Sequence, residues 1–298
     1  MRRAPHGPAP TFGAAVEAGR AAVAGVAGAS ARLEAERLAA GAARISRARL
    51  LAELRAPMPP AAREAFAHAV ARRAAGEPLA YVLGRAPFLD FEVAVGPAAL
   101  IPRPETERLA EWAIERARRR EVDGPGPARV LDVGTGSGVL ALAVARACPG
   151  ARVTATDLSP GAAAIAAANA RALGVAGQVD VRVADLWPPC EHPFDVVVAN
   201  LQYVGTGEMA DVAPDVLAWE PHGALFAGRD GLALLWRLAA GVAERLAPGG
   251  SVGLEVGWRQ ADEVAARLAA ALPTHDVASR PDDRGIARFV VAEPGDVR

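Results

Sequence analysis

Five short apolar runs, separated by helical segments and loops, constrain the fold of this chain more than any other feature. Strands and helices that alternate along a chain are typical of a parallel sheet with helices packed on its faces. The runs cover residues 129–133, 152–156, 179–184, 194–199 and 251–256, and helical patterns cover 138–147, 160–172 and 230–246. We therefore predict a Rossmann-like α/β domain built on a mostly parallel sheet.

Two more strand-like runs, at 275–279 and 286–292, lie near the C-terminus. They flank residues 281–285, Pro-Asp-Asp-Arg-Gly, a segment rich in residues that favour turns. A segment of this kind suits a hairpin. The sheet is therefore predicted to end in an antiparallel pair.

The N-terminal part shows a helical pattern from residue 11 to about residue 75. Ala-rich segments there carry leucine and isoleucine at helical spacings, and prolines at 57, 59 and 60 interrupt the run. Ser30 and Ser46 are the predicted N-caps. The pattern predicts a small helical bundle.

Between the two regions, Tyr81–Arg85 and Phe88–Val95 alternate apolar and polar residues around a turn, which predicts a β-hairpin. A helix is predicted at 107–120. At 298 residues with 52% hydrophobic content, the chain is long enough for two domains. The predicted divisions are a disordered leader at 1–10, the helical bundle at 11–80, the hairpin linker at 81–105 and the α/β domain at 106–298.

Charge and composition limit the possible partners. The net charge is -1, from 33 basic and 34 acidic residues, so no overall field favours nucleic acid or a membrane surface. The Ala/Gly-rich segment 21–30 is too weak for a signal peptide and too short to span a bilayer. We therefore expect a soluble cytoplasmic protein with no direct nucleic-acid partner and no membrane contact.

Metal and disulfide chemistry are not indicated. The two cysteines, Cys148 and Cys190, are too few for a disulfide scaffold. The histidines are far apart in the sequence and form no ligand motif; they are His6, His68, His192, His222 and His275. We predict no metal site.

The first strand of the α/β domain leads into a glycine loop and then directly into a helix. The loop is Gly134-Thr135-Gly136-Ser137-Gly138, whose alternating glycines allow a tight turn and a close approach to a ligand. This spacing differs from the G-x-G-x-x-G pattern that seats a pyrophosphate. Asp132, on the strand before the loop, would oppose a phosphate but suits a ligand with an ammonium group.

The next two strands also end in residues that suit a nucleoside. Asp157 ends the second strand and can accept hydrogen bonds from both ribose hydroxyls, as in dinucleotide folds. Asp185 and Leu186 follow the third strand, where they place a polar and an apolar group beside an adenine. Together with the glycine loop, these strand ends predict S-adenosyl-L-methionine as the cofactor. The alternative for Asp157 is a cap of the helix that begins at Pro160, a role that Ser159 can fill.

The fourth strand, Phe194–Ala199, runs into Asn200-Leu201-Gln202-Tyr203. Open α/β folds place their ligands at this carboxyl edge of the sheet. The Asn side chain offers one acceptor and two donors, and an aromatic face can hold a flat group. The tetrapeptide therefore suits a planar amide or amino group that is about to be modified.

These features together resemble the HemK/PrmC family. The resemblance rests on Leu100–Glu107, which reads L-I-P-R-P-E-T-E, on the glycine loop and on Asn200-x-x-Tyr203. It extends from about Ala29 to Val291 and includes the segments 72–84, 219–221 and 228–232. Members of this family are S-adenosylmethionine-dependent methyltransferases that act on the glutamine N5 amide of peptide chain release factors.

The resemblance implies a role for each matching residue. Gly134, Thr135, Gly136, Ser137 and Gly138 would cradle the methionine part of the cofactor, Asp157 the ribose, and Asp185 and Leu186 the adenine. Asn200, Leu201, Gln202 and Tyr203 would hold the substrate glutamine, with Asn200 and Tyr203 as the catalytic residues and Asn200 also beside the cofactor. The helical bundle would help to recognise the release factor, and the protein is expected to be a monomer.

The turn at Arg103-Pro104-Glu105 is expected to shape the mouth of the cofactor pocket, with interdomain scaffolding as the alternative.

The tetrapeptide departs from the family pattern Asn-Pro-Pro-Tyr, because Leu201 and Gln202 replace the two prolines. Proline fixes φ, so the replacement removes rigidity from the loop. Two further readings therefore stay open, an amino-methyltransferase for nucleic acid or another protein and a cofactor-binding homologue with impaired catalysis.

Overall fold

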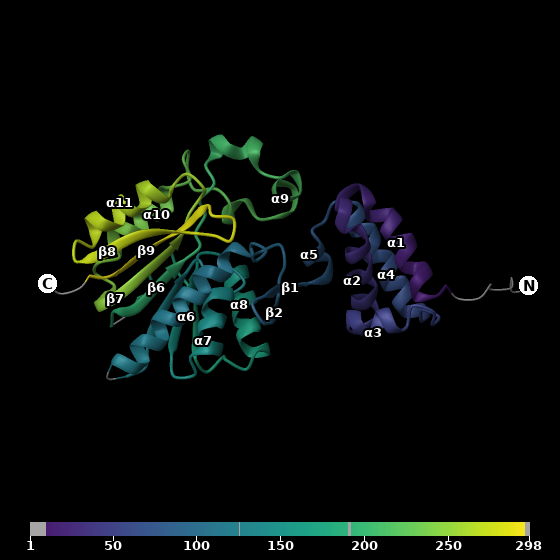
Figure 1. The fold of residues 1–298 in the computed structure, drawn as a ribbon, viewed down its shortest axis with the longest axis horizontal. Coiled ribbons are helices and arrows are strands. Elements are labelled where there is room, and N and C mark those ends of the chain that lie inside the picture. The colour runs from purple at the N-terminus through teal and green to yellow at the C-terminus, as the bar shows by residue number, and fades with distance from the viewer. Residues whose placement is uncertain (1–9, 125, 190–191, 296–298) are drawn as a thin grey trace, which may run out of the picture. The chain divides into compact units, whose positions relative to one another are not determined.

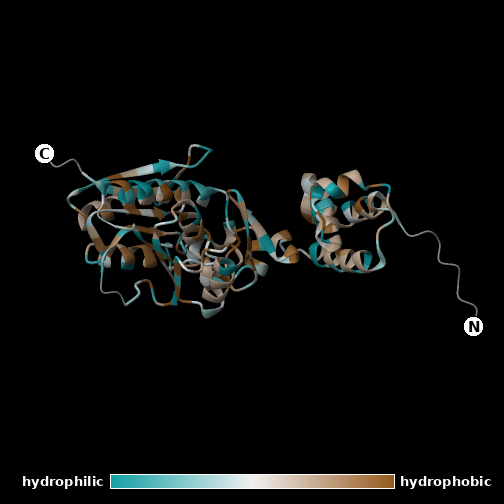
Figure 2. Cartoon of the chain, turned by 90° about the horizontal axis from the view of Figure 1, so that it is seen from below, coloured by the Kyte–Doolittle hydropathy of each residue, from teal (hydrophilic) through white to brown (hydrophobic). Residues whose placement is uncertain are grey.

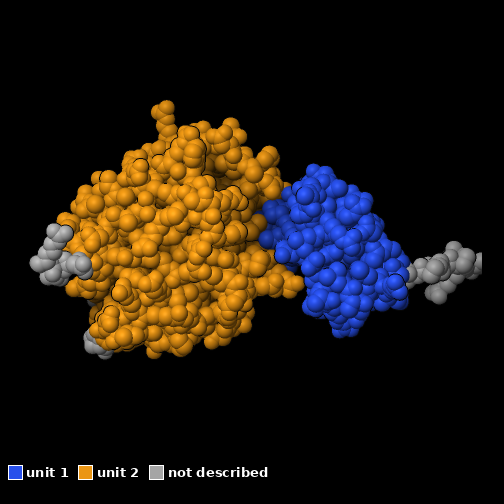
Figure 3. Space-filling model, in the orientation of Figure 1, with its two compact units in different colours: residues 1–84 blue, residues 85–298 orange. Residues whose placement is uncertain are grey.

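The structure is a computed structural model that describes residues 10–124, 126–189 and 192–295 (Figure 1). It divides into two compact units, Met1–Gly84 and Arg85–Arg298 (Figure 3). The predicted leader, apart from Pro10, lies outside the described residues, as do His6 and Cys190.

Unit 1 is helical, as the sequence predicted. Its core includes Leu38, Leu50 and Phe66, which lie on three different helices. The helices are α1 (Phe12–Ala27), α2 (Ala31–Ala43), α3 (Arg47–Ala52), α4 (Pro60–Ala74) and α5 (Leu79–Leu83). Ser46 caps α3 by accepting a hydrogen bond from Arg49 N at 3.1 Å, as predicted. Ser30 occupies the N-cap position of α2, as predicted, but its hydroxyl donates to Ala27 O at 2.8 Å and makes no capping bond to the helix.

The predicted hairpin begins later than expected. Tyr81 to Leu83 belong to helix α5, which follows Pro78 and ends at Gly84 in the left-handed conformation, φ 69°. A short apolar run does not by itself distinguish a helical turn from a strand, and here the Pro and Gly at its ends set a helix. The antiparallel hairpin consists of β1 (Arg85–Phe88) and β2 (Phe91–Ala94).

The larger unit contains a seven-stranded sheet in the order β5-β4-β3-β6-β7-β9-β8. The strands are β3 (Arg129–Val133), β4 (Arg152–Asp157), β5 (Val179–Val183), β6 (Phe194–Ala199), β7 (Leu246–Glu255), β8 (His275–Pro281) and β9 (Ala287–Pro294). Strands β3 to β7 are parallel, whereas β9 is antiparallel to both β7 and β8. The mostly parallel sheet with an antiparallel C-terminal pair is therefore confirmed.

Helices cover both faces of this sheet (Figure 1). They are α6 (Glu105–Asp123), α7 (Val139–Ala147), α8 (Pro160–Ala172), α10 (Ala233–Gly241) and α11 (Ala261–Ala271), whereas the short helix α9 (Pro214–Trp219) lies apart from both faces. Apolar residues of α10 and α11, such as Leu238 and Leu268, share a buried core with the strands. Hydrophobic and hydrophilic residues are mixed along the helices (Figure 2), as expected where one helix face is buried.

The predicted helix at 230–246 is shorter in the structure. Asp230 Oδ1 accepts a hydrogen bond from Leu232 N at 3.0 Å, and Gly231 has φ 78°, so a turn precedes α10. The helix ends at Gly241, a residue that disfavours continuation, and Leu246 already pairs with Phe194 in the sheet. Within the described part of the chain, no helix has the length and apolar character that a membrane span needs.

Candidate active site

The glycine loop and Asn200 lie side by side because they follow neighbouring parallel strands. Val133, at the end of β3, pairs with Ala199, at the end of β6, so Gly134 and Asn200 leave the sheet at the same edge. Gly134 has φ 72°, and a Cβ atom there would lie 2.6 Å from Leu201 Cδ2. The conformation and the contact both favour glycine at this position. The structure therefore places the glycine loop and the tetrapeptide at the same edge of the sheet.

Asp132 is a buried carboxylate below the glycine loop, with 1% of its surface exposed. Its Oδ2 accepts hydrogen bonds from Thr135 Oγ1 at 2.6 Å and from Ala141 N at 3.1 Å. Its Oδ1 has no partner among the described residues. Burial raises the pKa of Asp132 to about 6, although the bond from Thr135 opposes the increase. An unpaired buried carboxylate oxygen is costly and suits a cationic donor such as an ammonium group.

Asp157 is held in place by the backbone at the end of β4. Its Oδ2 accepts from Gly136 N at 2.9 Å and its Oδ1 accepts from Ser159 N at 2.8 Å. Ser159, not Asp157, caps α8, because its hydroxyl accepts from Ala162 N at 3.2 Å. Each carboxylate oxygen keeps further acceptor capacity, so Asp157 can still receive two hydroxyl donors.

Asp185 and Leu186 are engaged elsewhere. The Asp185 side chain pairs with Arg237 on α10 at 2.8 Å, and both side chains are about half exposed. Leu186 has φ 61°, packs into the core of the sheet and accepts a hydrogen bond at its carbonyl from Thr156 Oγ1 at 2.9 Å. Their role beside an adenine stays a prediction.

A cavity of about 50 Å³ lies between the glycine loop and Asn200. The lining residues come from the segment before α6, from α6, from β3 and its loop, from α7 and from the end of β6. They are Leu100, Ile101, Pro102, Arg103, Thr106, Asp132, Gly134, Thr135, Gly136, Ser137, Val139, Leu140 and Asn200. The cavity is therefore lined by four of the five glycine-loop residues, by Asp132, whose carboxylate suits an ammonium group, and by the predicted catalytic Asn200.

The L-I-P-R-P-E-T-E segment forms one wall of this cavity. Glu220, buried just after α9, accepts hydrogen bonds from Ile101 N at 3.0 Å and from the Arg103 guanidinium at 2.5 Å. Arg103 therefore pairs with Glu220 across 117 residues of sequence. Arg103 thus lines the cavity and is held by Glu220, while its role at the mouth of the pocket and the scaffolding alternative both stay predictions.

The tetrapeptide divides its side chains among different neighbours. Leu201 packs against Gly134 and into the core. Gln202 donates from Nε2 to Gly223 O, and its Oε1 has no partner among the described residues. The Gln202 amide therefore bonds to the backbone carbonyl of Gly223 and, among the described residues, makes no bond to Asn200. Tyr203 places its hydroxyl 3.4 Å from Glu255 Oε1, and burial raises the pKa of this phenol, with the Glu255 charge adding to the effect.

Asn200 is oriented by two residues that the sequence analysis did not assign to the site. Its Nδ2 donates to Thr106 Oγ1 at 3.0 Å, and Thr106 Oγ1 donates to Glu255 Oε2 at 2.8 Å. Thr106 and Glu255 are each 2% exposed. Thr106 lies in the segment that carried the resemblance, but no sequence signal pointed to Glu255. Glu255 lies in the predicted apolar strand at 251–256, a position that does not by itself mark a functional residue.

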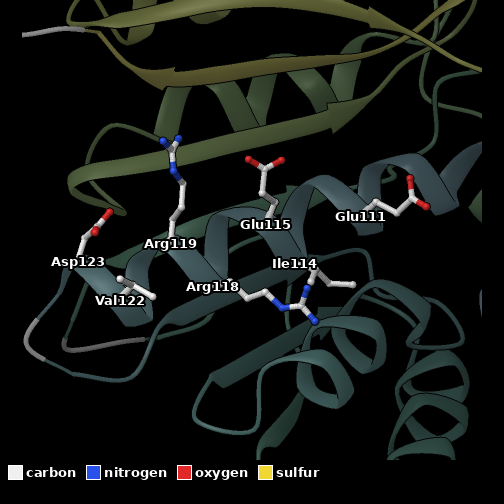
Figure 4. Close-up of a pocket in the computed structure, with 7 residues that line it drawn as sticks. All are labelled: Glu111, Ile114, Glu115, Arg118, Arg119, Val122 and Asp123. Atoms are coloured by element: carbon white, nitrogen blue, oxygen red, sulfur yellow. The ribbon is translucent and has the colours of Figure 1, made fainter.

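A second hollow lies outside this site. A hollow of about 440 Å³ runs along α6 and shares no residue with the cavity; Figure 4 shows its lining side chains on that one helix, Glu111, Ile114, Glu115, Arg118, Arg119, Val122 and Asp123. Among the described residues, no group of three or more His, Cys, Asp or Glu side chains is placed to hold a metal ion.

Comparison with known proteins identifies the two regions of the chain separately. Residues 14–84 match the family model for the PrmC N-terminal domain, and residues 130–219 match a model for a methyltransferase domain. The chain is 44% identical over 260 residues to the release factor glutamine methyltransferase of Bordetella pertussis, covering 87% of this chain and 93% of the relative. This match decides the family. The chain belongs to the HemK/PrmC family of release factor glutamine methyltransferases.

Solved structures also resemble this HemK/PrmC chain. The protein-(glutamine-N5) methyltransferase (release factor-specific) from Alicyclobacillus acidocaldarius is 36% identical, with 67% of this chain and 98% of that chain covered and a TM-score of 0.42. The catalytic domain of hMettl16 has a TM-score of 0.52 at 16% identity, over 77% of this chain and 82% of that chain, and supports the fold alone. The match to the methyltransferase-domain model and the 44% identical relative confirm the predicted S-adenosylmethionine-dependent methyltransferase domain.

Proposed function

We propose that this protein transfers the methyl group of S-adenosylmethionine to the side-chain amide nitrogen of a glutamine in a peptide chain release factor. Membership of the HemK/PrmC family supports the reaction, and the bonded orientation of Asn200 is the single observation on which its mechanism rests. A release factor acts in the cytoplasm, so we place this protein there too. We also propose that it works as a monomer.

The cofactor fits the residues at the strand ends. Asp132 Oδ1, buried and without a partner among the described residues, would accept from the cofactor ammonium group. Gly134 to Gly138 leave room for the methionine part, and Asp157 keeps lone pairs for the ribose hydroxyls. When bound, the cofactor supplies an electrophilic methyl group on a sulfonium.

The protein supplies position and charge stabilisation. An amide nitrogen is a poor nucleophile, because its lone pair is delocalised into the carbonyl group. The Asn200 Oδ1 and the Leu201 carbonyl oxygen would each accept one hydrogen bond from the substrate NH2 and align its nitrogen with the methyl carbon. Tyr203 would pack against the flat amide. No base is needed before transfer, since the methylated nitrogen becomes acidic and can lose its proton afterwards.

The change from proline to Leu201 and Gln202 need not remove this chemistry. The group used at position 201 is a backbone carbonyl, which every residue has. Gln202 donates to Gly223 O and so anchors the loop by a hydrogen bond where the family uses a fixed φ angle. We therefore favour a retained activity over a cofactor-binding homologue with impaired catalysis.

A transfer assay with labelled methyl groups separates these possibilities. The purified protein is incubated with the labelled cofactor and release factor, a Gln→Ala version of that factor, or nucleic acid. Label on the intact release factor alone supports the proposal. Label on nucleic acid supports the amino-methyltransferase alternative, and cofactor binding with transfer to none of the three supports the impaired homologue.

A further inference from the structure

Two buried residues set the direction in which the Asn200 amide points. An Asn side chain has a donor end and an acceptor end of nearly equal shape, so its hydrogen-bond partners decide its orientation. In the structure Nδ2 faces Thr106, and no described residue donates a hydrogen bond to Oδ1. The acceptor end is therefore left for a substrate at the cavity that Asn200 lines.

The single hydroxyl proton of Thr106 explains this orientation. Thr106 Oγ1 lies 2.8 Å from Glu255 Oε2 and 3.0 Å from Asn200 Nδ2. An ionised carboxylate can only accept, so the Thr106 proton points to Glu255. The hydroxyl then has only lone pairs to offer to Asn200, which must present its NH2 group. With Glu255 ionised, the Asn200 oxygen is directed away from Thr106.

We propose that Glu255 is a positioning residue for methyl transfer: through the Thr106 hydroxyl it holds the Asn200 carbonyl oxygen in place to accept the substrate amide. This inference rests on the proposed function. Glu255 need not contact the substrate, since its effect passes through Thr106.

The same relay depends on the protonation of Glu255. A proton on Oε2 makes the carboxyl group a donor to Thr106, whose own proton then turns toward Asn200 and attracts Oδ1. That inversion would withdraw the acceptor from the substrate. Burial raises the pKa of Glu255 to about 7. Thr106 on α6, Arg288 on β9 and Tyr203 after β6 oppose the increase, whereas Glu105 on α6 adds to it.

Substitutions at Thr106 test the relay by activity. Thr106→Val keeps the shape but cannot accept from Asn200, so kcat should fall roughly 10- to 100-fold while cofactor affinity is retained. Thr106→Ser restores the hydroxyl and should recover most of the lost kcat. A purely structural role for Thr106 would not give rescue by the smaller serine, which leaves a gap in a buried site.

Substitution at Glu255 tests the dependence on protonation. At saturating cofactor and release factor, kcat of the wild type should rise with pH through about 7. In Glu255→Gln the side chain cannot titrate, so that step should be absent. Glu293→Gln is the matched control, because Glu293 is a partly buried carboxylate on the same sheet that binds Trp112 Nε1 at 2.7 Å. The control variant should show the same dependence of kcat on pH as the wild type.

The orientation can also be observed without turnover, by NMR of the Asn200 side-chain amide in the ¹⁵N-labelled protein, assigned from its loss in Asn200→Ala. Its signals should titrate near pH 7 in the wild type and stay constant in Glu255→Gln. If the wild type transfers no methyl group, the proposed function fails while this titration still tests the relay. An amide signal that does not titrate in the wild type, or full kcat in Thr106→Val, overturns the inference.

Discussion

The two halves of the candidate active site are built in different ways. The cofactor half is mainly backbone: glycines in left-handed conformations, with Asp157 fixed by the N–H groups of Gly136 and Ser159. The substrate half depends on side chains, because Asn200 is oriented by Thr106 and Glu255 from two distant parts of the chain. A site held mainly by backbone tolerates changes in nearby side chains other than the two carboxylates, Asp132 and Asp157, whereas a relay of side chains fails when any one member is lost.

Removing the Asn200 amide should have the largest effect. In Asn200→Ala the substrate nitrogen loses an acceptor, so we expect methyl transfer to fall roughly 100- to 1000-fold, comparable to the loss of one donor from an oxyanion hole. Cofactor affinity, measured by calorimetry, should stay within a few fold, since Asp132 and Asp157 remain. If transfer survives, the role assigned to Asn200 is wrong.

Asp132 provides the corresponding test of the cofactor half. Its carboxylate must be ionised to pair with an ammonium group, so cofactor affinity should weaken as pH falls through about 6. Asp132→Asn should weaken binding roughly 100-fold and remove this pH dependence. Calorimetry across the pH range gives the affinity of both proteins. Glu255→Gln should leave the pH dependence of cofactor affinity unchanged. Loss of this pH dependence in Glu255→Gln would mean that the two halves of the site are coupled.

The glycine loop is expected to respond more mildly. Gly134→Ala adds a Cβ that would lie 2.6 Å from Leu201 Cδ2 and strains a left-handed residue by about 1–2 kcal/mol. Relief of this strain would move the loop out of the conformation that the cofactor contacts, so we expect the cofactor dissociation constant to rise about 10-fold. Gly177→Ala is the control, because no atom lies within 4 Å of the added Cβ. Equal affinity in the two variants would contradict the close-approach argument.

The smallest effect should follow from Gln202→Pro. Loss of the hydrogen bond to Gly223 O lowers the free energy of unfolding by about 1 kcal/mol. Proline also restricts the unfolded chain, which raises the free energy of unfolding by a similar amount. Stability from thermal unfolding and the transfer rate should both change little, within about threefold for the rate. A gain or loss of more than tenfold would show that Gln202 shapes the choice of substrate.

Sequence reasoning succeeded where a feature depends on neighbours in the chain. The ends of β3, β6 and α8 agree with the prediction. The structure also brings the glycine loop and Asn200 to one edge of the sheet, because the strands that precede them are neighbours. It failed at α5 and at the end of α10, where single Gly and Pro residues decide between helix, turn and strand.

The relay could not be predicted for a different reason. Thr106 and Glu255 are 149 residues apart in sequence, and the buried carboxylate has no local pattern that distinguishes it from an ordinary strand end. Likewise, the partner of Arg103 proved to be Glu220, which is 117 residues away. Such pairs become visible only when the sheet brings the segments together.

The central claim is that a glutamine side-chain amide is the methyl acceptor. Mass spectrometry of the release factor after incubation with this protein and S-adenosylmethionine tests it most directly. The account predicts one added methyl group, located on the side-chain nitrogen of a single glutamine and absent when Asn200→Ala replaces the wild type. A methyl group on any other kind of residue would contradict it.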